Sequence, residues 1–198
     1  MSYGDQAMNV VEPIRDLKKI EAMKRMLHKS KRDTLLFIMG INTALRVSDL
    51  LSLTVCDVWD GKGHLLRAVK LKEQKTGKIK EFPLNEAIQK TLKAYFEERF
   101  RRHSPDPDEP LFVSPKGRKA LGRQQAWRIL NEAGKAVGLE KIGTHTLRKT
   151  FGYHVFQRSG GNLALVQKLL NHSSSGDTLR YIGIDREQMD AAYLELNL

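Results

Sequence analysis

The sequence contains one cysteine, Cys56, and it has no long run of apolar residues. One cysteine cannot form a disulfide within the chain, and its neighbours in the segment VCDV predict a packed rather than a reactive position. No apolar run reaches the roughly 18 residues that a membrane-spanning helix requires, and no signal segment opens the chain. We therefore expect a soluble, cytoplasmic protein that has no disulfide and no association with a membrane.

Metal-binding patterns are also missing from the sequence. His64, His103 and His154 have no cysteine or carboxylate partners at the spacing that metal ligands usually show. We therefore expect neither a metal ion nor another cofactor.

Acidic residues are scarce relative to basic ones. The chain has 34 Lys and Arg against 23 Asp and Glu, which gives a formal net charge of +11. Residues 62–80 alone hold seven basic side chains and one acidic side chain. An acidic membrane surface would suit the net charge, but DNA contact explains a concentrated basic segment better. The expected partner is double-stranded DNA.

Periodicity and capping residues predict mainly helices. A helical pattern opens at Pro13, with apolar residues Ile14, Leu17, Ile20, Met23 and Met26 at helical spacing. Further helices are expected after Ser30, over 48–53, after Asn85, over about 121–137, after Thr144, after Asn162 and after Asp185. Residues 64–84 instead predict a β-hairpin that turns at Thr76 and Gly77. The fold class is therefore α+β, mainly α-helical, with a small antiparallel sheet.

The length of 198 residues fits one domain. The segment RRHSPDPDEP, with three prolines, is the linker candidate by composition, but we treat it as a loop. We expect a core over about 12–184, followed by a C-terminal helix or tail over 185–198.

Two segments near the C-terminus combine residues with complementary chemistry. HTLRKTFGYH holds His145 three residues before Arg148, and LLNHSSSGDTLRYIGI holds His172 nine residues before Tyr181. Upstream, TALRVSDLLSL contributes Arg46 and Asp49, and LKEQKTGKIKEFPL contributes a lysine in the predicted hairpin. To break a DNA strand without metal or ATP, an enzyme must supply its own nucleophile. A tyrosine hydroxyl, with a pKa of about 10, needs a proton acceptor, and a histidine can provide one.

Each of these residues, taken alone, has an ordinary structural explanation. His145 and Arg148 at this spacing simply share a helix face. His172 could be a histidine at a helix end, Tyr181 a core aromatic and Arg46 a solvated cation. The conjunction is what favours a site, because all the segments occur in one chain.

The set of segments resembles the active site of the tyrosine recombinases, the phage integrase family. The resemblance implies that Arg46 and Arg148 clamp the transition state, that His145 and His172 assist, and that Tyr181 is the nucleophile. In the family the general-acid lysine lies in the hairpin, which makes Lys75 the best match and leaves Lys72 and Lys78 possible. Asp49 is close enough to Arg46 to orient it. Contacts to DNA are expected from Lys72, Lys78, Arg123 and Arg128.

The resemblance covers about residues 12–184 and implies cleavage through a 3′-phosphotyrosyl intermediate, with four protomers joined on two duplexes. Family members usually carry a separate N-terminal helical domain, which we expect to be absent because only 45 residues precede Arg46. Asn171 stands where the family often has glycine, a change compatible with a left-handed helix end. The segment SSSGD is expected to be a flexible connector before Tyr181.

Two other functions use the same features. Type IB topoisomerases relax DNA with similar Arg, Lys, His and Tyr chemistry, and a non-catalytic DNA-binding regulator could keep the fold. The intact set of residues argues against the regulator, so we expect a site-specific recombinase or integrase of a mobile element.

Overall fold

The computed structural model describes residues 11–115, 117, 119–183 and 193–196. Most of the secondary structure in this part of the chain is helical. The chain forms, in order, α1 (Leu17–Leu27), α2 (Lys31–Asn42), α3 (Val47–Leu51), the 3-10 turn η1 (Val55–Asp57), β1 (Ala68–Lys72), β2 (Ile79–Pro83), α4 (Glu86–Arg99), α5 (Arg123–Ala136), α6 (Thr146–Arg158), α7 (Leu163–Leu169) and α8 (Ser175–Ile182). The predicted fold class is confirmed.

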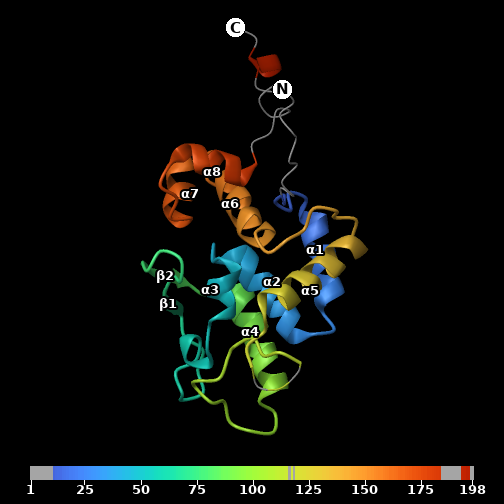
Figure 1. Cartoon of the computed structure of the whole chain (residues 1–198), viewed down its shortest axis with the longest axis vertical. Coiled ribbons are helices and arrows are strands. Elements are labelled where there is room, and N and C mark those ends of the chain that lie inside the picture. The colour runs from blue at the N-terminus through green and yellow to red at the C-terminus, as the bar shows by residue number, and fades with distance from the viewer. Residues whose placement is uncertain (1–10, 116, 118, 184–192, 197–198) are drawn as a thin grey trace, which may run out of the picture.

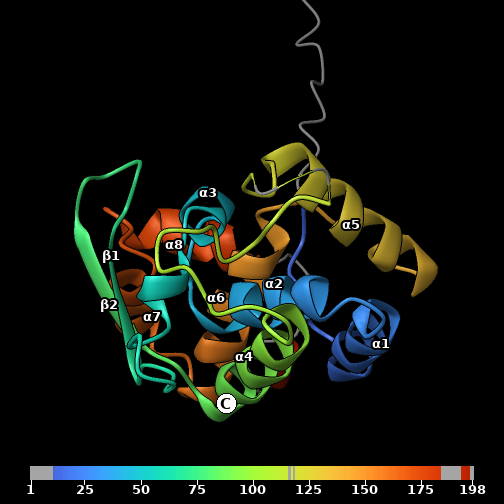
Figure 2. The same cartoon turned by 90° about the horizontal axis from the view of Figure 1, so that it is seen from below.

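Helix α2 lies at the centre of the molecule and packs against α1, α4 and α6. The last three helices, α6 to α8, gather at one end, drawn in orange and red in Figure 1. The hairpin of β1 and β2 lies on the opposite side of the molecule from α1 (Figure 2). The segments that carry the candidate residues therefore meet where α3, the hairpin and the C-terminal helices come together.

Among the residues that the structure describes, two apolar clusters form the core. The larger one is built from α1 to α5 and the hairpin, and Phe37, Met39 and Phe112 lie fully inside it. The smaller one joins Ala44 to Val166, Leu170 and Ile182, which come from α7 and α8 and the turn after α7. Burial of these side chains is the main term that fixes the C-terminal helices against the rest of the chain.

The predicted β-hairpin forms, with its turn at the predicted Thr76 and Gly77. Strand β1 pairs with β2 in antiparallel fashion, with Val69 opposite Phe82 and Lys72 opposite Ile79. The turn over 73–78 is closed by the Glu73 amide, which donates to the Lys78 carbonyl at 2.9 Å, and by the Gly77 amide, which donates to the Glu73 carbonyl at 2.9 Å. A two-stranded hairpin of this kind needs packing against helices to be stable.

Three predicted N-caps are confirmed. The side chains of Ser30, Asn85 and Asn162 each accept a hydrogen bond from a backbone amide in the first turn of α2, α4 and α7. Each one satisfies an amide that has no partner within its own helix.

Two predicted helix starts are wrong. Helix α1 begins at Leu17 rather than Pro13, because Asp16 caps it and the Ile14 amide donates instead to the Thr150 hydroxyl at 2.8 Å. The first residue of α1, Leu17, is 65% exposed, and Met26 is 49% exposed. Thr144 does not cap α6; His145 holds that position, and its side chain makes no capping hydrogen bond.

Two further expectations need correction. Ser174 caps α8 and accepts from the Asp177 amide at 3.1 Å, so the last three residues of SSSGD are helical rather than a flexible connector. Cys56 is exposed on η1, not packed. The helix expected after Asp185 falls largely on 184–192 and 197–198, outside the described residues.

The close approach of α2 and α6 depends on Gly40. A Cβ atom at this position would lie 2.3 Å from Leu147 Cδ1, and Leu147 is buried. We predict that Gly40→Ala destabilises the chain by roughly 1 to 3 kcal/mol relative to Gly176→Ala, because overpacking strains a dense core. Gly176 in α8 has nothing within 4 Å of the added Cβ, so it controls for helix propensity. Urea unfolding measures both variants, and equal free energies would contradict the packing account.

Candidate active site

One pocket brings the six predicted catalytic residues together. It has a volume of about 450 Å³ and opens between the start of α3, the hairpin turn, the start of α6 and the helices α7 and α8. Its lining includes all six: Arg46, Lys75, His145, Arg148, His172 and Tyr181. Residues from segments as far apart as 46 and 181 thus face one space.

Arg148 is the most deeply buried of these six, with 2% of its surface exposed. Its Nη1 donates to the Ala44 carbonyl at 2.5 Å and its Nη2 donates to the Leu170 carbonyl. Burial lowers the pKa of Arg148 from its ordinary value, but a guanidinium remains charged in proteins. The side chain therefore ties α6 both to the turn before α3 and to the end of α7.

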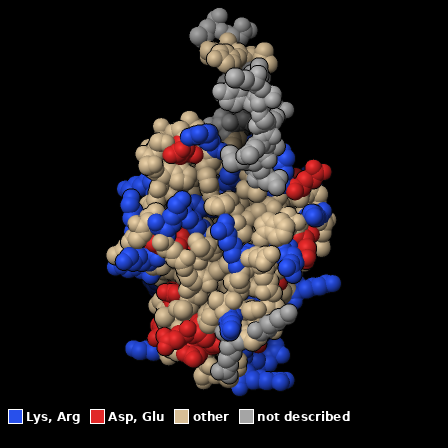
Figure 3. Space-filling model, in the orientation of Figure 1, with Lys and Arg blue, Asp and Glu red and all other residues tan. Residues whose placement is uncertain are grey.

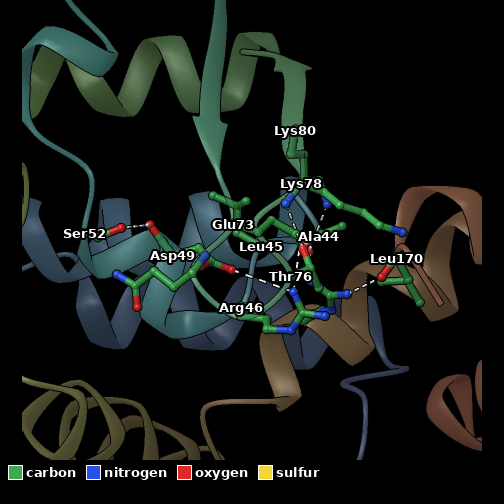
Figure 4. A network of polar contacts seen from close by, with 12 residues as sticks. Ala44, Leu45, Arg46, Asp49, Ser52, Glu73, Thr76, Lys78, Lys80 and Leu170 are labelled. Carbon is green, nitrogen blue, oxygen red and sulfur yellow. Dashed lines mark hydrogen bonds and ion pairs between the residues drawn. The ribbon is translucent and has the colours of Figure 1, made fainter. Parts of the chain in front are cut away.

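Lys80 reinforces the same contact from the hairpin. Its Nζ donates to the Leu169 carbonyl at 2.9 Å. It also donates to the Ala44 carbonyl at 3.3 Å (Figure 4). Burial, followed by the charge of Arg148, lowers the pKa of Lys80 to about 8. Lys80 was not among the residues predicted from the sequence. A signal existed, because Lys80 stands two residues before the buried Phe82 on β2 and so lies on the same face of the strand.

The shared acceptor, Ala44, has an unusual backbone. Its φ of 57° lies in the left-handed region, which costs a residue with a Cβ about 1 kcal/mol or more. In return, its carbonyl meets both Arg148 and Lys80. The conformation also turns the chain so that Arg46, two residues later, is the N-cap residue of α3.

Arg46 faces two buried carboxylates. Its Nη1 lies 3.2 Å from Glu73 Oε1 and 4.0 Å from Asp49 Oδ2. Both carboxylate side chains have no exposed surface. Asp49 was expected to orient Arg46, yet its Oδ1 also accepts from the Gln74 amide at 2.9 Å and so holds the hairpin turn. Glu73 was not among the residues predicted from the sequence. Its signal was that it is the one acidic residue in the basic segment 62–80.

The three hairpin lysines differ in position. All three are exposed, but Lys75 lines the pocket from the turn. Lys72, at the end of β1, and Lys78, directly before β2, do not line it. The geometry thus supports Lys75 over its two neighbours as the residue that reaches the reaction centre. Their contacts with DNA stay a prediction.

His145, His172 and Tyr181 form an aromatic group at the mouth of the pocket. His145 Nδ1 lies 3.4 Å from the Tyr181 hydroxyl. The rings of His172 and Tyr181 pack edge to face, with 4.9 Å between their centroids. Asn171 before His172 adopts the predicted left-handed conformation, with φ of 51°. The Nδ1 atom of His172 also contacts the Thr178 hydroxyl at 3.2 Å.

Burial favours the uncharged forms of all three side chains. Loss of solvent around part of the ring, then the charges of Arg123 and Arg148, lower the pKa of His145 although the residue is exposed. Burial and then Arg148 lower the pKa of His172. Burial raises the pKa of Tyr181 and outweighs the opposing charges of Arg148 and Arg46. At neutral pH the histidines are thus mostly uncharged, which leaves a ring nitrogen available to accept a proton, and Tyr181 keeps its own proton.

Further cations surround the pocket. Lys149, which the sequence analysis did not single out, lies with its Nζ 5.4 Å from the centre of the Tyr181 ring. Arg123 and Arg128 are both exposed on α5, and neither lines the pocket. Basic side chains are spread widely over the face shown in Figure 3, whereas acidic ones gather in smaller groups. An anionic ligand meets favourable charge on this face.

The described residues contain no group of three or more His, Cys, Asp or Glu that could hold a metal ion. Within the same part of the chain, none of the helices has the length and apolarity required to cross a membrane.

We predict that Arg123→Ala raises the pKa of His145 toward 6.5 and leaves the pKa of His172 unchanged, because the Arg123 charge acts on His145 alone of the two. Titration of the histidine ring protons by NMR measures both values in the DNA-free protein. Arg128→Ala is the matched control and should move neither. A shift of both histidines in Arg123→Ala, or of neither, would contradict the arrangement.

Comparison with known proteins assigns the family. The model of the Phage integrase family matches residues 15–188. The chain is 48% identical over 187 residues to "Probable integrase/recombinase YoeC" of Bacillus subtilis (strain 168), which covers 94% of this chain and 97% of that protein. It is 30% identical over 183 residues to tyrosine recombinase XerA of Pyrococcus furiosus, covering 91% of this chain and 60% of that protein.

Solved structures share the fold. The crystal structure of XerA recombinase superposes with a TM-score of 0.73 at 22% identity, over 96% of this chain and 67% of that chain. The XerH site-specific recombinase bound to its palindromic difH substrate gives a TM-score of 0.70 at 24% identity, over 97% of this chain and 55% of that chain. With the family match over most of its length and a pocket that unites the six residues, this chain belongs to the phage integrase family of tyrosine recombinases.

Proposed function

We propose that this chain is a site-specific recombinase that cleaves and rejoins double-stranded DNA through a 3′-phosphotyrosyl intermediate. The observation that carries the proposal is the pocket in which two guanidinium groups, a lysine, two histidines and a tyrosine meet. This set supplies a nucleophile, a proton acceptor, a transition-state clamp and a proton donor without a cofactor.

In the cleavage step, the Tyr181 oxygen attacks the scissile phosphorus and the bond to the 5′-oxygen breaks. His145, with its Nδ1 3.4 Å from the hydroxyl, accepts the tyrosine proton. Arg46 and Arg148 stabilise the charge that develops on the non-bridging oxygens, because planar guanidinium groups match phosphate geometry. Lys75 gives a proton to the departing 5′-oxygen, and His172 packs against the tyrosine ring.

Rejoining reverses these steps with a different strand. A 5′-hydroxyl of the partner strand attacks the phosphotyrosyl bond and releases Tyr181, so the bond energy is conserved without ATP. Four protomers on two duplexes would allow this exchange, and the exposed Lys72, Lys78, Arg123 and Arg128 would contact the backbone. The proposal includes a cytoplasmic location, where the protein meets DNA, and a role in the movement of a mobile element.

Tyr181→Phe should abolish the covalent protein–DNA adduct while leaving DNA binding intact, because only the attacking oxygen is removed. The measurement is incubation with a nicked suicide substrate followed by denaturing electrophoresis. Tyr153→Phe is the matched control, since Tyr153 pairs with His154 and Arg15 and does not line the pocket. Persistence of the adduct in Tyr181→Phe would move the nucleophile to another tyrosine, such as Tyr153 or Tyr193.

Lys75→Ala should slow cleavage by about 10² to 10⁴-fold, the usual effect of losing a general acid. A substrate with sulfur at the 5′-bridging position needs no proton on its leaving group, so the variant should recover most of its rate there. Single-turnover rates on both substrates make the comparison, with Arg46→Ala expected to stay slow on each. Equal defects of Lys75→Ala on the two substrates would transfer the role to Lys72 or Lys78, or leave the hairpin a purely phosphate-binding role.

A further inference from the structure

Glu73 is an unusual residue for its position. It directly follows β1 and begins the turn that carries Lys75, in the most basic segment of the chain, yet it is 1% exposed. The neighbours Lys72, Gln74, Lys75 and Thr76 are all exposed. A carboxylate is costly to bury, so its contacts must compensate for the lost water.

The contacts of Glu73 point in two directions. Its Oε2 accepts from the Thr76 hydroxyl at 2.6 Å, which holds the far side of the turn. Its Oε1 lies 3.2 Å from Arg46 Nη1 (Figure 4). Burial raises the pKa of Glu73, but the Thr76 hydrogen bond and the Arg46 charge, followed by smaller effects of Asn171 and Lys80, bring it below its ordinary value. The side chain is therefore an anion that bridges the turn and the guanidinium.

Lys75 lies between two anchored residues. On one side, the Gln74 amide donates to Asp49 Oδ1 at 2.9 Å. On the other, the Thr76 hydroxyl donates to Glu73. Since Asp49 and Glu73 also face Arg46, the position of the Lys75 backbone depends on carboxylates that share the Arg46 guanidinium.

The contact between Arg46 and Glu73 is close but incomplete. Arg46 Nη1, Asp49 Oδ2 and Glu73 Oε1 are buried, and none of the three has a hydrogen-bond partner among the residues that the structure describes. A guanidinium that shifts slightly toward Glu73 when it binds a phosphate would convert the 3.2 Å contact into a charge-assisted hydrogen bond. Phosphate capture would then tighten the turn beside Lys75.

We propose that Glu73 is a positioning residue that couples the Arg46 guanidinium to the turn carrying Lys75. This role rests on the proposed function. One buried carboxylate then links phosphate recognition by Arg46 to the placement of the general acid Lys75. Glu73 does not touch the substrate itself; it acts through Thr76 and Arg46.

The test compares Glu73→Gln with Glu81→Gln in the full chain. Both changes remove one negative charge from the same hairpin, but Glu81 is exposed on β2 opposite Lys70. Single-turnover cleavage of a nicked suicide substrate is measured with oxygen and with sulfur at the 5′-bridging position. Glu73→Gln should lose roughly 10-fold to 100-fold on oxygen, as expected for a catalytic group misplaced by about 1 Å. It should recover most of that loss on sulfur, while Glu81→Gln cleaves both like the wild type.

An equal loss on the two substrates would overturn the coupling, because Glu73 would then act only on Arg46 or on the fold. Full activity of Glu73→Gln on oxygen would overturn it as well. If Glu73→Gln does not fold, Thr76→Val replaces it, since this variant removes only the hydroxyl that donates to Glu73. The same recovery on sulfur is expected, and its absence counts against the proposal.

Amide hydrogen exchange separates this inference from the proposed function. In the DNA-free chain, Glu73→Gln should speed exchange at Gln74 and Gly77, whose amides close the turn, and Glu81→Gln should not. If the wild type forms no covalent adduct but the exchange changes as expected, the proposed function fails and the coupling stands. Unchanged exchange in Glu73→Gln would overturn the coupling whatever the activity.

Discussion

The buried guanidinium of Arg148 is the interaction on which the site depends. Burying a charge is unfavourable unless hydrogen bonds replace the lost water. The carbonyls of Ala44 and Leu170 meet that need, and they come from the turn before α3 and the end of α7. The end of a helix also favours a cation, and Lys80 adds a second one at Leu169. Satisfying one charge thus draws three separate segments to a common point.

The remaining groups are arranged around that point. Arg46 follows Ala44 closely, His172 follows Leu170, and Tyr181 on α8 packs into the smaller apolar cluster beside them. The positive charge that should attract a phosphate also helps keep His145 and His172 deprotonated, so one field serves both binding and proton transfer. Two buried carboxylates, Asp49 and Glu73, limit the repulsion among the cationic side chains of the site, and they also hold the hairpin turn.

Local signals made much of this predictable from the sequence. Caps such as Asn85 act within one turn, and the hairpin alternation acts within one strand pair, so both were found without tertiary information. The six pocket residues were found because each stands in a distinctive segment. Lys80 escaped because its partners, the turn at Ala44 and the end of α7, are distant in sequence. Glu73 escaped because the cation that it faces, Arg46, lies on another segment. The start of α1 was missed for the same reason, since Ile14 bonds Thr150 on α6.

The central claim is that a preassembled pair of arginines receives the scissile phosphate, and a structure of the Tyr181→Phe chain bound to a DNA duplex tests it most directly. The account predicts a phosphate with non-bridging oxygens within hydrogen-bond distance of Arg46 and Arg148, while Arg148 still donates to the Ala44 and Leu170 carbonyls. A phosphate bound elsewhere, or an Arg148 side chain that has left both carbonyls to reach the DNA, would contradict it.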